Sequence, residues 1–122
     1  MQPNHPYAFH VLGLIKYQIG DTQRAIELLE RSIEIKPDLS DALKSLATIY
    51  AELEKLDMAI TKFKQVIAIT PDSFEAHYNL AAIYQMQNRL DDAKKHYQTA
   101  LDIKPDLVEA RNKLEEIARI SN

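Results

Sequence analysis

The chain has 122 residues and a formal net charge of -3, and its content of 46% hydrophobic and 27% charged residues is that of a globular domain. Acids and bases are interspersed, which excludes the basic face that nucleic acid requires. The absence of cysteine excludes a disulfide framework and a thiolate metal site, and it predicts a cytoplasmic location. No apolar run is long enough to predict a membrane span, and the opening residues do not resemble a signal peptide.

Apolar residues recur at helical spacing from residue 6 to 19, and Gly20 ends this first predicted helix. A second helix is predicted from 22 to 35, and Pro37 stops it. The same two patterns follow at 40–53 and 56–69, then at 74–87 and 90–103, before a last pattern at 108–120. The segments between the two predicted helices of each pair are short, so each pair is predicted to form an antiparallel helical hairpin with a tight turn. The sequence therefore predicts three helical hairpins and a single final helix.

The sequence superimposes on itself when it is shifted by 34 residues, the spacing from Pro37 to Pro71. Four columns of identical residues result: Pro3, Pro37, Pro71 and Pro105; Ala8, Ala42, Ala76 and Ala110; Leu12, Leu46, Leu80 and Leu114; Ile15, Ile49, Ile83 and Ile117. A fixed period of this size is typical of stacked repeats, in which each unit buries its apolar face against its neighbours.

The repeated residues resemble the tetratricopeptide repeat pattern of aromatic, Leu-Gly, Ala and Pro positions. The matching residues are Phe9, Leu12, Gly13, Gly20, Ala25, Leu29 and Pro37; Leu46, Ala47, Tyr50, Ala59, Phe63 and Pro71; Leu80, Ala81, Tyr84, Ala93, Tyr97, Ala100 and Pro105. Departures occur at Lys16, Ser32, Glu54 and Asn88. The resemblance implies an all-α, right-handed α-solenoid. One tetratricopeptide domain over residues 1–122 would hold helix-turn-helix repeats at about 6–39, 40–73 and 74–107 and a C-terminal capping helix at 108–120.

The small residues Gly13, Ala47 and Ala81 are predicted to lie where the two helices of a hairpin cross closely, opposite a second column of alanines. The corresponding residue of the last helix is Glu115, whose carboxylate would be buried and unpaired if another helix followed. The last helix is therefore predicted to be a cap with a solvated face. That face consists of Asn112, Lys113, Glu115 and Glu116.

The resemblance also implies that the first helix of each repeat lines a concave groove. The predicted partner-binding residues are Tyr7, His10, Val11, Leu14, Tyr17, Lys44, Ser45, Thr48, Tyr78, Asn79, Ala82 and Gln85. Family members that hold an acidic C-terminus use a clamp of Lys, Asn and Arg, but the matching positions here are His10, Leu14, Ser45, Glu75 and Asn79. An asparagine ladder, used by sugar-transferring relatives, is reduced to Asn79. The clamp for an acidic C-terminus is therefore absent, and the asparagine ladder is not continued beyond this one residue.

The predicted function is a non-enzymatic scaffold for protein–protein interaction. From Asp41 onward the groove carries five acids against two lysines, so the partner segment is expected to be neutral to basic. Its apolar anchor should lie at the amino-terminal end of the groove, near Tyr7 and Leu14. That apolar patch is open to two interpretations, an anchor pocket or the face left by a missing upstream unit. The alternatives are assembly into a homo-oligomer through the first helix, and the recruiting part of a larger, transferase-like enzyme.

No catalytic residue, metal site or cofactor is predicted. Asp92 and His96 share a helix face at i,i+4 spacing, but a metal would need at least one further converging ligand. Both are therefore expected to be solvated on the outer face. His77 occupies an aromatic column and is expected to be a packing residue.

Overall fold

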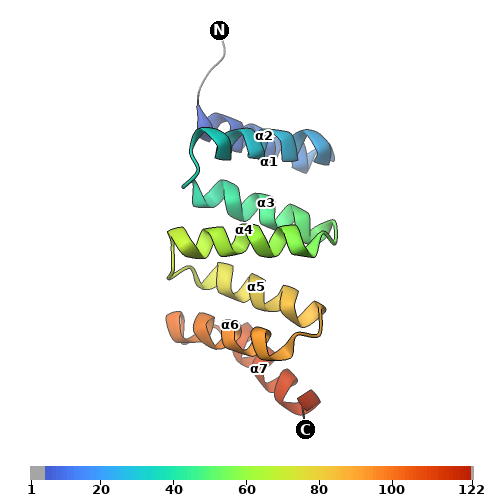
Figure 1. Cartoon of the computed structure of the whole chain (residues 1–122), viewed down its shortest axis with the longest axis vertical. Coiled ribbons are helices and arrows are strands. Elements are labelled where there is room, and N and C mark those ends of the chain that lie inside the picture. Colours follow the sequence, from blue (N-terminus) through green and yellow to red (C-terminus); the bar gives the residue numbers. More distant parts are fainter. Residues whose placement is uncertain (1–4, 122) are drawn as a thin grey trace. The chain divides into compact units, whose positions relative to one another are not determined.

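The structure, a computed structural model, describes residues 5–121, the last of them in its backbone only. Within this range it consists of helices and turns, without strands (Figure 1). The helices are α1 (Pro6–Gln18), α2 (Thr22–Ile35), α3 (Ser40–Glu52), α4 (Leu56–Ile69), α5 (Phe74–Met86), α6 (Leu90–Ile103) and α7 (Val108–Ser121). The first helix of each hairpin ends one residue earlier than predicted, because Ile19, Leu53 and Gln87 are C-caps.

The chain divides into two compact units, Met1–Gln65 and Val66–Asn122. The first, here called unit 1, contains α1, α2, α3 and the start of α4, and the second, unit 2, contains the rest of α4 with α5, α6 and α7. Each unit has its own buried side chains and its own part of the predicted binding surface. A single domain over residues 1–122 stays a prediction.

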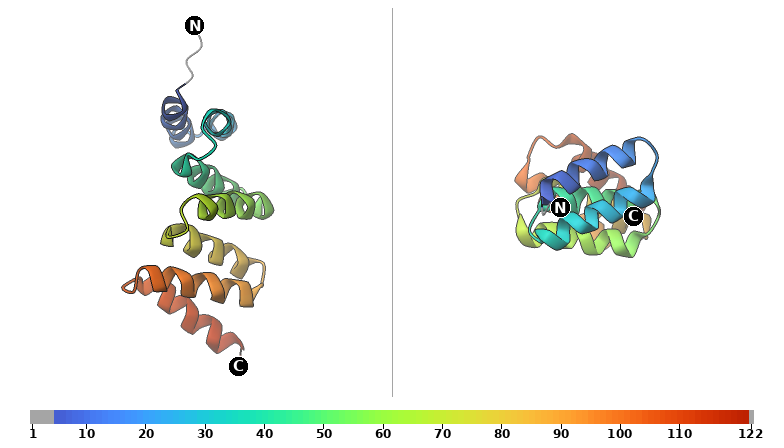
Figure 2. Two further views of the ribbon diagram at one scale, coloured as in Figure 1. Left: turned by 60° about the vertical axis from the view of Figure 1, so that its left-hand side comes forward. Right: turned by 90° about the horizontal axis from the view of Figure 1, so that it is seen from above.

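In unit 1, α1 and α2 form a hairpin (Figure 2), and the two helices approach each other closely at Gly13. A Cβ atom on Gly13 would lie 3.0 Å from Leu29 Cγ and 3.3 Å from the backbone oxygen of Ala25. Ala25 and Leu29 are themselves fully buried, so neither has space to retreat. The predicted close crossing at Gly13 is therefore confirmed, and it explains why the hairpins have only small residues, Gly13, Ala47 and Ala81, in this column.

Ser32 stands where the repeat pattern has alanine, and it is fully buried in unit 1. Its Oγ donates a hydrogen bond to the carbonyl oxygen of Pro6 at 2.6 Å. A buried hydroxyl without a partner would be destabilising, but this one is satisfied. Ser32 thus ties the last turns of α2 to the first turn of α1.

In unit 2, the side chains of α5, α6 and α7 meet around Tyr97, the largest fully buried side chain. Leu80 and Ala81 of α5 and Ala93 of α6 are also completely buried, and Ile117 closes the core from α7. Figure 2 shows α7, in red, beside α6, in orange. The apolar stripe of each helix therefore faces a neighbour, as the repeat columns predict.

The turn within each hairpin adopts one backbone form at Gly20, Glu54 and Asn88, whose φ angles are 92°, 61° and 59°. In the second hairpin, the N–H of Glu54 donates to the carbonyl of Ala51 at 3.0 Å, and the next N–H donates to the carbonyl of Tyr50 at 2.8 Å. This pair of bonds is the Schellman arrangement, whose left-handed residue is usually glycine. The three turns therefore share a conformation although only one of them has glycine there.

Candidate partner-binding surface

In unit 1, α1 provides the apolar part of the predicted surface. The side chains of Tyr7 and Val11 are 59% and 55% exposed. Leu14 and Tyr17 are half-buried on the same helix. An aromatic ring beside branched aliphatic side chains is the kind of surface that anchors the apolar side chains of a partner.

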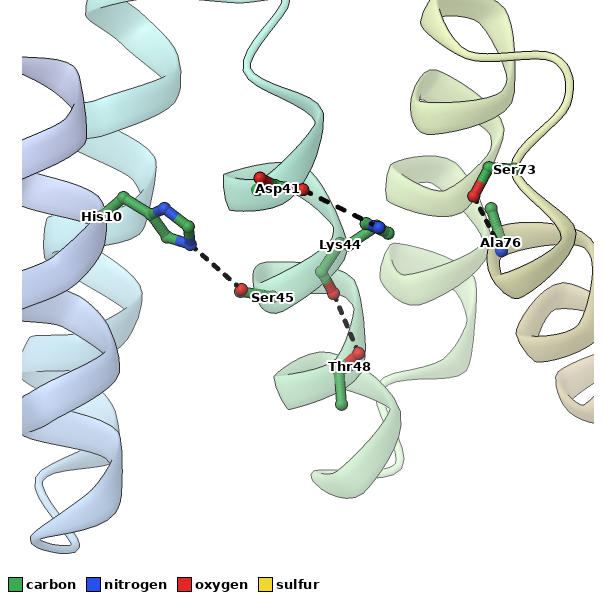
Figure 3. A network of polar contacts seen from close by, with 7 residues as sticks. All are labelled: His10, Asp41, Lys44, Ser45, Thr48, Ser73 and Ala76. Atoms are coloured by element: carbon green, nitrogen blue, oxygen red, sulfur yellow. Dashed lines mark hydrogen bonds and ion pairs between the residues drawn. The ribbon is translucent and has the colours of Figure 1, made fainter.

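Two of the predicted residues contact each other between α1 and α3. Nε2 of His10 lies 3.3 Å from Oγ of Ser45 (Figure 3). Burial lowers the pKa of His10, and the carboxylate of Asp41 raises it by a smaller amount. The ring is therefore mostly neutral at pH 7, so it adds no positive charge to the surface.

The polar side chains of α3 are held by one another. Nζ of Lys44 lies 3.8 Å from Oδ1 of Asp41, and Oγ1 of Thr48 donates to the carbonyl oxygen of Lys44 at 2.9 Å (Figure 3). The charge of Lys44 is offset by Asp41, and the hydroxyl of Thr48 is used within its own helix. The α3 part of the surface is polar, with its charges compensated.

In unit 2, the predicted residues Tyr78 and Asn79 line a pocket of about 280 Å³ at the start of α5 and the start of α7. Phe74, Glu75, Leu107 and Glu109 line the rest of it. The ring of Tyr78 packs edge-on against Tyr97, with centroids 5.4 Å apart. This contact fixes the ring of Tyr78 against the core, so the pocket has one preformed aromatic wall.

The pocket lies in a negative electrostatic environment. Burial raises the pKa of Tyr78, and the carboxylates of Glu109 and Glu116 raise it further. A nearby negative charge opposes formation of the phenolate, which is the physical cause of that second contribution. The same field favours any positively charged group that enters beside the ring.

Gln85 is the centre of a hydrogen-bonded chain that links three helices of unit 2. It accepts a bond from Oη of Tyr97 at 2.8 Å, and its Nε2 donates to Oε2 of Glu116 at 2.7 Å. The prediction that Glu116 belongs to a solvated face is therefore wrong, because its carboxylate is half-buried and reaches back to α5. Glu115, in contrast, is exposed as predicted for a cap.

His77 and His96 contact each other, which the sequence did not predict. Nδ1 of His77 lies 3.1 Å from Nδ1 of His96, and Nε2 of His77 lies 3.1 Å from the carbonyl oxygen of Pro71. Because a carbonyl can only accept, Nε2 of His77 carries a proton, and in the neutral pair Nδ1 of His96 is the donor. His77 is buried, which confirms its packing role. The outer-face interpretation of His96 is wrong, since its ring stacks on His77.

Asp92, the other member of the predicted pair, lies close to Arg89, with 3.1 Å between Oδ2 and Nη2. Across residues 5–121, no group of three or more His, Cys, Asp or Glu side chains could hold a metal ion. No helix in this range is long and apolar enough to cross a membrane.

The predicted residues are divided between the two units, and the structure brings together His10 with Ser45 in one and Tyr78 with Asn79 in the other. Tyr7, His10, Val11, Leu14, Tyr17, Lys44, Ser45 and Thr48 belong to unit 1, and Tyr78, Asn79, Ala82 and Gln85 to unit 2. Phe74 and Leu107 line the pocket although neither was among the predicted residues. The sequence signal for Leu107 is its column, in which Leu39 is the same residue and Ser73 stands between them, and both leucines are buried.

Over residues 5–121, helices joined in succession by short turns, with aromatic or polar surface on α1, α3 and α5, define a helical repeat protein. The tetratricopeptide repeat matches residues 6–39 and 74–107, and a TPR repeat model matches residues 47–88. The chain belongs to the tetratricopeptide repeat (TPR) family. No match was found among curated proteins.

Several solved structures share the fold. A crystal structure of MamA has a TM-score of 0.92 and 22% identity, with 98% of this chain and 70% of that chain covered. The first TPR of Spaghetti (RPAP3), bound to the HSP90 peptide SRMEEVD, has a TM-score of 0.89 and 21% identity, with coverage of 98% and 95%. YrrB, described as a TPR protein with an unusual peptide-binding site, has a TM-score of 0.83 and 23% identity, with coverage of 94% and 58%.

Proposed function

We propose that the chain is a non-enzymatic scaffold that binds a segment of a partner protein on the first helices of its repeats. The observation that carries this proposal is the exposed aromatic and apolar surface of α1, where Tyr7 is 59% and Val11 55% exposed. An apolar anchor of the partner would bind there. Two of the similar structures are described by their peptide ligand or peptide-binding site, which supports a peptide-like partner.

The partner segment is neutral to basic. RPAP3 was solved with a peptide that contains two consecutive glutamates and an aspartate. In the present chain, one position of the family clamp for acidic ends is Glu75, which lines the pocket together with Glu109. Two carboxylates would repel an acidic segment and attract a basic one.

The test is a peptide array screened with the purified chain and two matched variants. In the first, Tyr7 and Leu14 are replaced by alanine, and in the second, Glu75 and Glu109 are replaced by glutamine. The first should weaken binding far more, because desolvated aromatic anchors carry most of the binding energy and rim charges mainly tune rate and salt dependence. Preferential binding of acidic peptides would contradict the proposal.

A second function, assembly, is favoured by a different face of α1. Leu12 and Ile15 are 43% and 47% exposed, whereas Leu46, in the column of Leu12, is fully buried and Ile49, in the column of Ile15, is 2% exposed. A helix from another copy of the chain, packed on Leu12 and Ile15, would bury these side chains as fully as Leu46 and Ile49 are buried in α3. Sedimentation of the wild type and of a Leu12→Ser, Ile15→Ser variant would test this. A mass that stays monomeric at all concentrations would exclude assembly through this face.

A further inference from the structure

The pocket of unit 2 joins an aromatic wall to carboxylates from two different helices. Tyr78 and Glu75 come from α5, and Glu109 comes from α7. Leu107, in the loop before α7, is 8% exposed and adds a buried apolar side chain to the lining. The pocket is therefore amphipathic, with an aromatic and aliphatic interior and acidic groups at exposed positions.

The described lining residues include two carboxylates and neither lysine nor arginine. Neighbouring basic side chains have other contacts. Nζ of Lys104 lies 5.3 Å from the centre of the Phe74 ring at the edge of the pocket, but it is paired with Oδ1 of Asp106 at 3.4 Å. Nη2 of Arg111 donates to the carbonyl oxygen of Pro105 at 3.0 Å. Lys113, one turn along α7 from Glu109, is outside the lining. The carboxylate of Glu109, which also raises the pKa of Tyr78, therefore favours a cation in this pocket.

Each glutamate is in the first turn of its helix, where the helix dipole already favours an acid. That preference explains the residue type at each position, but it does not require the two acids to share one pocket with a tyrosine ring. A tyrosine ring in a pocket with carboxylates suits a planar guanidinium, which can pack against the ring and direct its N–H groups at the oxygens.

We propose that this pocket binds the guanidinium of an arginine side chain in the partner segment. The inference rests on the proposed scaffold function and specifies the chemistry of its basic part. The aliphatic stem of the arginine packs on Leu107, the guanidinium lies against Tyr78, and Glu109 accepts its hydrogen bonds. Arginine is favoured over lysine because an ammonium group neither stacks nor offers a fork of donors.

The direct test is an NMR titration with N-acetyl-arginine amide, using N-acetyl-citrulline amide and N-acetyl-lysine amide as matched probes. Citrulline has nearly the shape of arginine without its charge, and lysine has the charge without the planar fork. We expect saturable shifts of the Tyr78 and Asn79 amide signals with the arginine probe, and binding at least several-fold weaker with the other two. Equal affinity for the citrulline or the lysine probe would overturn the proposal.

Substitutions locate the contact. Glu109→Gln should weaken binding of the arginine probe about threefold, the scale of an exposed ion pair, and Glu75→Gln with Glu109→Gln about tenfold. Lys113→Gln is the control, because it removes a positive charge instead of a negative one, and it should leave the affinity for the arginine probe unchanged or raise it. Tyr78→Phe keeps the ring and should retain binding, whereas Tyr78→Leu should lose it. Unchanged affinity in both the Glu75/Glu109 and Tyr78→Leu variants, with folded NMR spectra, would refute the assignment.

The same probes separate this inference from the proposed function. If array peptides bind but replacing their arginines by citrulline has no effect, the pocket assignment fails and the scaffold function stands. If the arginine probe binds the pocket but no peptide binds the chain, the scaffold function fails and the pocket assignment stands.

Discussion

His77 and His96 face each other through their Nδ1 atoms, which lie 3.1 Å apart, while Nε2 of His77 bonds to the carbonyl of Pro71. This two-bond arrangement joins α5 to α6 and to the loop before α5. Phenylalanine at position 77 keeps the ring packing but can make neither bond. We expect His77→Phe to lower the free energy of unfolding by about 1 kcal/mol.

A double-mutant cycle in urea is the measurement for this pair. Because the two Nδ1 atoms are in contact, His96→Phe should cost less in the His77→Phe background than in the wild type, with a coupling energy of about 0.5–1 kcal/mol. If the losses in unfolding free energy of the two single variants add up to that of the double variant within about 0.3 kcal/mol, the two rings do not interact energetically.

The turn residue Glu54 is in a left-handed conformation with φ of 61°, which is unfavourable for a side chain with a Cβ. Glu54→Gly should therefore stabilise the chain by about 0.5–1 kcal/mol. Gly20→Ala is the matched control and should destabilise by a similar amount, because nothing lies within 4 Å of a Cβ at Gly20 and only its φ of 92° causes strain. Thermal denaturation would measure both. A destabilised Glu54→Gly variant would contradict this account.

Tyr50 links stability to alkaline pH. Burial raises its pKa to about 12, and the hydrogen bond that its Oη donates to Oε2 of Glu30 at 3.0 Å adds to the rise. In the unfolded chain the pKa is about 10. The folded state therefore holds this proton more tightly, and its contribution to stability is complete below pH 10 and is lost as pH rises from 10 through 12.

The melting temperature of Tyr50→Phe should fall less steeply above pH 10 than that of the wild type, although the variant is less stable at pH 7. Tyr7→Phe is the control, because Tyr7 is exposed and makes no comparable buried bond. Melting temperatures at half-unit steps from pH 8 to 12 would show the difference. Parallel curves for the wild type and Tyr50→Phe would contradict the assignment.

The exposed Glu115 and the buried Ala81 occupy one column of the repeat and should respond in opposite ways to substitution. Glu115→Ala should leave stability nearly unchanged, because a surface charge contributes little. Ala81→Glu should cost several kcal/mol, since it would place a carboxylate in the packed core of unit 2. Equal shifts in melting temperature would mean that α7 is not a cap.

The helices and the core could be predicted because they depend on periodic features of the sequence. Identical residues at a spacing of 34 align Leu46 with Leu80, and both are fully buried. A proline after each second helix and a turn residue in each hairpin then set the helix ends to within one residue. These signals are local and repeated, so each repeat supports the interpretation of the others.

The side-chain contacts that differ between repeats could not be predicted in the same way. The repeat pattern says nothing about His96 meeting His77, because that contact depends on residues found only in the third hairpin. Gln85 was predicted as a binding residue from its position alone, whereas its amide is bonded to Tyr97 and Glu116. The hydrogen-bond partners of such side chains depend on rotamers and distances, which the columns of the repeat do not encode.

The exposed face of Leu12 and Ile15 also has a consequence for the order in which the chain opens. Helices of a repeat protein are held mainly by their neighbours, and α1 packs mainly on α2, with a side-chain contact to α3 between His10 and Ser45. Its amide protons should therefore exchange with solvent sooner than those of α3, by local opening that does not require global unfolding. The aromatic anchor surface of Tyr7 would then lie on a helix less protected than α3, and a bound partner would be visible as slower exchange in α1.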